Sequence, residues 1–130
     1  MPTFHESGPA ARFALHLDGD EIARFDELAI GDAGAAAGRG LLAHELAHTV
    51  QQRAGRGAAC VALRRGRIQQ AALARLRTAP GSRVRVVALS AGKPGPGIDL
   101  LGVKVGRSVG MAKGTDVAME ELVLVAEGLD

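Results

Sequence analysis

The chain has 130 residues, of which 47% are hydrophobic and 23% charged, a balance typical of one globular domain and not of a disordered chain. No apolar run approaches the roughly 20 residues that span a bilayer, and the N-terminus lacks the basic and apolar stretches of a secretory signal. The single cysteine, Cys60, excludes an intramolecular disulfide. We therefore expect a chain that is synthesised in the cytoplasm, with no signal peptide and no membrane segment.

The net charge of +2 hides an uneven distribution along the chain. Residues 1–50 hold eight acids and three bases, residues 51–98 hold ten bases and no acid, and residues 99–130 hold six acids and three bases. Such a basic block can bind phosphate groups, or it can meet the acidic segments within the fold or between subunits. Because Trp and Tyr are absent, the aromatic platforms on which nucleic-acid bases stack are missing, which favours the second interpretation.

The first predicted element is a β-hairpin. Residues 12–17 alternate loosely between polar and apolar, the Asp-Gly-Asp run at 18–20 supplies a turn, and residues 21–25 form the returning strand. The Gly- and Ala-rich residues 31–40 then predict a connector without regular structure.

Two helices are predicted in the middle of the chain. Residues 41–53 place apolar side chains on one face and polar ones on the other, and a short strand is expected at 60–63, closed by residues 64–67. A second helix is expected at 68–78, before the Pro-Gly pair at 80–81. The apolar faces of the two helices are formed by Ala43, Leu46, Ala47 and Val50 in the first and by Ile68, Ala72, Leu73 and Leu76 in the second.

The last third of the chain has a β pattern. Residues 83–89 alternate between arginine and valine, which predicts a strand, and residues 93–97 (Lys-Pro-Gly-Pro-Gly) predict a loop. Further strands are expected at 98–105 and at 117–127, the longest of them. The alternation in this last strand places Leu122 on one face and Val123 on the other, and both faces are mostly apolar.

One motif carries chemistry. His44-Glu45-Leu46-Ala47-His48 matches H-E-x-x-H, in which two histidines one helical turn apart bind one zinc ion and the glutamate acts as general base on a metal-bound water. The alternative is an amphipathic helix whose polar face carries two histidines without a metal. The longer stretch 41–55 resembles the helix of the metallopeptidase-like core domain found beside extracellular contractile injection systems. This resemblance implies His44 and His48 as zinc ligands and Glu45 as the catalytic base.

A third protein ligand for a catalytic zinc is not evident. Between Leu46 and Ile98 there is no acidic residue and no histidine other than His48. Cys60 is in range along the sequence, and three more distant residues, His5, His16 and Asp99, are candidates only if the fold brings them close. We therefore expect zinc to be dispensable for the main role of the chain, and peptidase activity to be absent from the isolated chain.

A second resemblance covers more of the chain, residues 12–28 and 60–130. Residues 13–28 are similar to the opening hairpin of contractile-type phage tail-tube proteins, and residues 61–67 to that family's strand with a basic ending before its helix. Residues 102–105 and 113–129 are similar to the family's final strand pair. Residues 31–59 do not follow this family, which indicates one domain, residues 1–130, with a replaced central segment that carries the H-E-x-x-H helix.

This resemblance implies an α+β, β-rich fold of two packed antiparallel sheets, a barrel or sandwich of the tail-tube type, with helices at 41–53 and 68–78. The implied function is that of a structural subunit which assembles into six-membered rings that form or cap the inner tube of a contractile injection particle. Other tail, sheath and baseplate proteins would be its partners. The alternatives are a small zinc-dependent hydrolase based on His44, Glu45 and His48, and a basic nucleic-acid-binding module.

Overall fold

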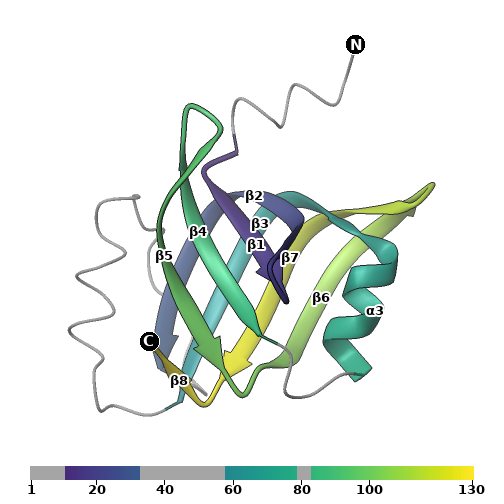
Figure 1. Cartoon of the computed structure of the whole chain (residues 1–130). Helices are drawn as coiled ribbons and strands as arrows, with labels where there is room; N and C mark the ends of the chain where they lie inside the picture. Colours follow the sequence, from purple (N-terminus) through teal and green to yellow (C-terminus); the bar gives the residue numbers. More distant parts are fainter. Residues whose placement is uncertain (1–10, 33–57, 79–82) are drawn as a thin grey trace.

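The computed structural model describes residues 11–32, 58–78 and 83–130, so the helix expected at 41–53 lies outside the described residues. The described residues form eight strands and one helix (Figure 1). In chain order these are β1 (Phe13–Leu17), β2 (Asp20–Asp32), β3 (Ala59–Gln69), α3 (Gln70–Thr78), β4 (Val84–Ser90), β5 (Lys93–Leu101), β6 (Lys104–Lys113), β7 (Asp116–Ala126) and β8 (Gly128–Leu129).

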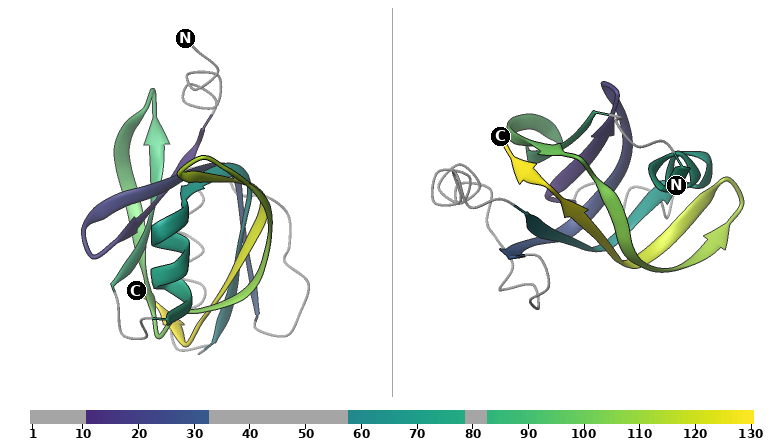
Figure 2. Two further views of the ribbon diagram at one scale, coloured as in Figure 1. Left: turned by 90° about the vertical axis from the view of Figure 1, so that its right-hand side faces the viewer. Right: turned by 90° about the horizontal axis from the view of Figure 1, so that it is seen from below.

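All eight strands belong to one open antiparallel sheet in the order β6-β7-β3-β2-β1-β4-β5-β8. The expectation of two packed sheets, as a barrel or sandwich, is therefore wrong. The reason is that β7 pairs with β3 along its length as well as with β6, so the C-terminal hairpin extends the first sheet and forms no second layer. The sheet coils strongly, as Figure 2 shows. This coiling lets β8 pair with β5 although only Glu127 separates it from β7.

The core lies on the inner side of the coiled sheet, where helix α3 packs against it. The helix contributes Ala72, Leu73 and Leu76, all buried, which confirms the predicted apolar face for these three residues. The helix begins at Gln70 and not at residue 68, because Ile68 is still a strand residue paired with both Ala23 and Val117.

Three neighbouring strands, β7, β3 and β2, change their inward-facing side at the same level of the sheet. Between β2 and β3 the register stays constant across this level, so both strands change together. Arg65, in the middle of β3, has a φ of 54°, a left-handed conformation that breaks strict alternation. The simple alternation expected along residues 117–127 is therefore wrong, because the inward-facing side changes between Met119 and Leu122. Residues 64–67, which were expected to close a short strand at 60–63, instead continue β3. The inward-facing residues on either side of the change are Phe25 and Leu28 in β2, Leu63 and Ile68 in β3, and Met119 and Leu122 in β7.

The loop expected at 93–97 is also wrong, because Lys93 already begins β5. The chain turns instead at Ala91 and Gly92, just before the proline-rich segment. Their φ angles of 53° and 79° give the geometry of a tight hairpin turn. The single strand expected at 98–105 is divided at Gly102, which has a φ of 60° and separates β5 from β6. The predicted hairpin turn at Asp18 and Gly19 is confirmed, with φ angles of 52° and 92°.

Candidate assembly surface

The residues of the H-E-x-x-H motif, His44, Glu45 and His48, lie outside the described residues, as does His5. Within residues 11–32, 58–78 and 83–130 no group of three or more His, Cys, Asp or Glu side chains could hold a metal ion. Cys60 lies on β3, and three strands, β2, β1 and β4, separate it from β5 in the sheet. Cys60 is therefore remote from Asp99 along the sheet, whereas His16 and Asp99 line one pocket.

Cys60 is a buried free thiol near the start of β3, opposite Gly31 of β2 and Val125 of β7. Burial raises the pKa of this thiol above its usual value, and the negative charge of Glu121 raises the pKa further. A raised pKa keeps the thiol protonated, which disfavours metal binding and nucleophilic chemistry. Cys60 thus acts as a small apolar side chain in the sheet.

Five arginines of the basic block pair with carboxylates of the two acidic segments. On the outer face of the central strands, Arg64 Nε lies 3.0 Å from Glu121 Oε2, and Arg65 pairs with Glu27. Arg67 lies 4.0 Å from Asp116, Arg75 lies 3.1 Å from Asp18, and Arg85 lies 2.9 Å from Asp99. This confirms, for the described residues, the expectation that the fold joins acidic and basic segments, and it leaves fewer arginines for a phosphate backbone.

The edge of the sheet formed by β6 is the most exposed apolar part of the described chain. β6 pairs with β7 on one side, and β6 is the last strand of the sheet on the other. The five residues Val109 to Lys113 are all exposed, and Figure 1 shows the β6–β7 hairpin projecting beyond helix α3. Val109 is 39% exposed and Met111 69%. We call residues 109–113 the β6 edge; its free backbone groups and apolar side chains are what an added strand from another chain would cover.

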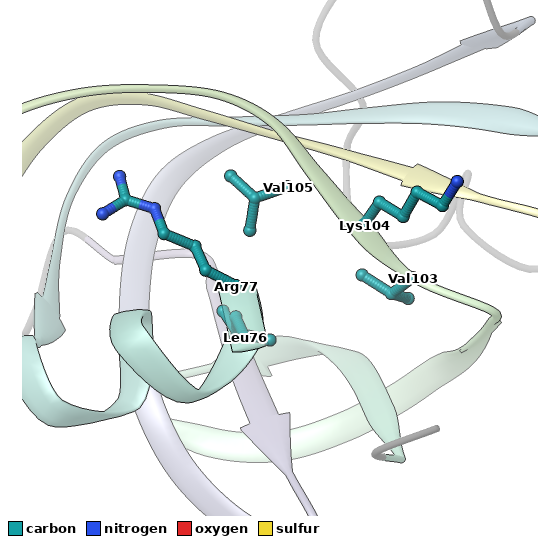
Figure 3. A pocket seen from close by; sticks show the side chains of 5 residues that line it. All are labelled: Leu76, Arg77, Val103, Lys104 and Val105. Atoms are coloured by element: carbon teal, nitrogen blue, oxygen red, sulfur yellow. The ribbon is translucent and has the colours of Figure 1, made fainter. Parts of the chain in front are cut away.

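Nearer the base of β6 a groove of about 510 Å³ separates this strand from the end of α3. Its apolar lining consists of Leu76, Val103 and Val105, and Figure 3 shows Arg77 and Lys104 on opposite sides of these three side chains. Arg77 also donates a hydrogen bond to the hydroxyl of Ser108 on β6, which ties the helix to this strand. The end of α3 is therefore attached to β6 beside this groove.

In a comparison with known protein families, residues 3–56 match the model described as the eCIS core domain. This match associates the chain with extracellular contractile injection systems. It includes the predicted helix at 41–53 together with β1 and β2, and it ends before β3. No curated protein matches the chain. Among the described residues, no helix is long and apolar enough to cross a membrane.

The sequence did not predict the β6 edge. The sequence indicates no regular element at 106–112, because four glycines at 102, 106, 110 and 114 interrupt the apolar pattern. The available signal is the run Val-Gly-Met-Ala at 109–112, a short apolar stretch between Arg107-Ser108 and Lys113. A Cβ atom added to Gly110 would lie 2.7 Å from Met119 Sδ and 2.8 Å from the Ala118 carbonyl oxygen. At this position glycine therefore serves the close approach of β6 to β7, and not a loop.

Proposed function

We propose that the chain is a structural subunit of a phage-tail-like contractile injection particle, and that it forms or caps the inner tube by assembling into six-membered rings. The family match over residues 3–56 supports the association with such particles. The resemblance of residues 12–28 and 60–130 to tail-tube proteins supports the more specific role. In this proposal residues 1–130 form one domain, and residues 31–59 are the segment in which it departs from the tube family.

The observation that carries the proposal is the β6 edge. The β6–β7 register shifts at Val105/Arg107 and again at Val109/Gly110, so this edge is irregular, but it carries no proline and no described segment covers it. A subunit of a ring can leave such an edge open for its neighbour. Covering Val109 and Met111 removes apolar surface from water and satisfies the free backbone groups in the same contact. Other tail, sheath and baseplate proteins are the further partners of this proposal.

The test is electron microscopy of the purified chain over a range of concentrations, with sedimentation velocity on the same samples. We expect six-membered rings at high protein concentration or after addition of the cognate tail proteins. A chain that remains monomeric under all of these conditions contradicts the proposal.

The hydrolase alternative depends on His44, Glu45 and His48 and is tested separately. We expect weak or assembly-dependent zinc binding, because the sequence offers no evident third protein ligand beside His44 and His48. Peptide cleavage and zinc content are measured for the parent, for Glu45→Gln and for His44→Ala/His48→Ala. If the parent cleaves peptide and Glu45→Gln does not, the chain is an enzyme and the structural role is wrong. Equal assembly and no cleavage in all three agree with the structural role.

A further inference from the structure

A polar pocket of about 370 Å³ lies on the outer face of the sheet, far along the sheet from the β6 edge. It is lined by His16, Asp18, Gly19, Arg83, Arg85 and Asp99. The strand register explains this grouping, since His16 of β1 is directly opposite Arg85 of β4, and Arg85 is directly opposite Asp99 of β5. The volume is within the range of small-ligand sites.

The carboxylates of this pocket already have hydrogen-bond donors. Asp18 accepts from the backbone N–H of Arg83 at 2.9 Å with one oxygen and from Arg75 at 3.1 Å with the other. Asp99 accepts from Nη1 of Arg85 at 2.9 Å. The acceptors of the pocket are therefore largely occupied.

The donors of the pocket are in excess. The guanidinium group of Arg83 makes no hydrogen bond or ion pair with the described residues, and Arg85 uses one of its nitrogens. The Nε2 atom of His16 is buried and has no hydrogen-bond partner, a costly state for a polar atom. A ligand that brings acceptor oxygens would satisfy both groups, whereas a metal cation would be repelled by the two arginines.

We propose that this pocket binds an oxyanion, either a free phosphate-like ion or the carboxylate of a side chain from a second copy, held by the Arg83 guanidinium and His16 Nε2. The site is on β1, β4 and β5, so the inference does not depend on pairing at the β6 edge or on the ring proposal. The tight turn at Asp18 and Gly19 forms one wall of the pocket and fixes the backbone beside the ligand.

The test uses the full chain and follows the imidazole signal of His16 by NMR, assigned with His16→Gln, while sodium phosphate replaces sodium chloride at constant ionic strength. The decisive variant is Arg83→Gln. The matched control is Lys93→Gln, which removes the same charge at the far end of the β4–β5 hairpin and does not line the pocket. We expect a saturable shift in the parent and the control, and binding weaker by about tenfold or more in Arg83→Gln, as for loss of a charged hydrogen bond.

A second series dilutes the protein without phosphate to distinguish the two sources of the oxyanion. A His16 signal that moves with protein concentration, and does so less in Arg83→Gln, identifies a carboxylate from a second copy. A response to phosphate alone identifies a free ion. If neither phosphate nor protein concentration moves the signal, or if Arg83→Gln and Lys93→Gln respond alike, the inference is wrong and the pocket is only hydrated surface.

Discussion

The two edges of the sheet are built in opposite ways. The β6 edge contains no proline, presents Val109 and Met111, and pairs with β7 on one side, while no described strand pairs with its other side. The edge formed by β5 carries Pro94 and Pro96, which have no N–H to offer to another strand. Its last residues pair with β8, and Asp99 exchanges two backbone hydrogen bonds with Asp130 at 3.0 and 2.9 Å.

This difference indicates that strand addition is permitted on one side only. A sheet with two open edges can pair indefinitely and aggregate, whereas one open edge limits strand addition to one contact per copy. A ring requires each copy to present two different surfaces, so the β6 edge of one copy would meet a surface other than β5 on the next. The four changes below test this comparison, from the largest expected effect to the smallest.

The largest effect is expected from Val109→Lys/Met111→Lys, which places two charges on the β6 edge. Both side chains are exposed, so the free energy of unfolding should change by no more than about 0.5 kcal/mol, the usual range for surface substitutions. Assembly should be lost, because lysines at an edge oppose strand addition. Sedimentation velocity and electron microscopy measure this directly.

The matched control for this change is Leu101→Lys, on the opposite edge, where the side chain is 49% exposed. It should assemble like the parent. Equal assembly of the β6 double variant and the parent would show that the β6 edge is not the contact, whatever the stability of the two proteins.

The next effect concerns the protected edge and is tested by removing residues 128–130. The deletion removes the pairing of β8 with β5, the two hydrogen bonds between Asp99 and Asp130, and the packing of Leu129 against the core. We expect a loss of about 2–4 kcal/mol in the free energy of unfolding, from the lost hydrogen bonds and buried apolar area. Urea denaturation measures it. Asp130→Ala keeps the backbone bonds, and a comparable loss in that variant would contradict this account.

A smaller effect is expected from adding one methyl group to a glycine on each side. At Gly110 in β6 the new Cβ would lie 2.7 Å from Met119 Sδ and 2.8 Å from the Ala118 carbonyl oxygen, so Gly110→Ala should cost about 1–3 kcal/mol through overpacking. At Gly95 in β5 the only near atom is the Ala88 carbonyl oxygen at 3.3 Å. Gly95→Ala should cost less than about 1 kcal/mol, because reduced freedom of the unfolded chain offsets the contact. A larger loss for Gly95→Ala, measured by urea denaturation, would reverse the comparison.

The parts of the fold that the sequence predicted are those with a local cause. The hairpin of residues 12–25 follows from the Asp-Gly turn, the strand 83–89 from alternation of arginine and valine, and the buried side of α3 from the spacing of Ala72, Leu73 and Leu76. The single sheet could not be predicted in this way, since it depends on β7 pairing with β3, which joins residues as far apart in sequence as Ala59 and Ala126. The change in the inward-facing side of the strands near Arg65 depends on one backbone angle, which the neighbouring residues do not predict.

The candidate sites were predicted less well, for the same reason. Residues 93–97 suggested a loop because Pro and Gly alternate there, yet Leu89 pairs with Pro94 and makes this segment an edge strand. His16 was identified as a distant candidate for a metal ligand, whereas the register places it opposite Arg85, in surroundings that suit an anion. The motif residues His44, Glu45 and His48 lie outside the described residues, and their role stays a prediction.

The last change, and the sharpest test of the protected edge, is Pro94→Thr/Pro96→Thr. Both prolines are exposed, so the change should lower the free energy of unfolding only by the entropy that proline removes from the unfolded chain, about 0.4–1 kcal/mol per site. The variant would restore two N–H groups and leave a second open edge opposite β6. We therefore expect new self-association at concentrations where the parent shows only its own assembly, seen as larger species in sedimentation velocity. Lys93→Thr is the control, since it adds threonine to the same strand and keeps both prolines. If the double variant and this control associate equally, the prolines do not guard the edge, and the open β6 edge alone cannot explain a directed assembly.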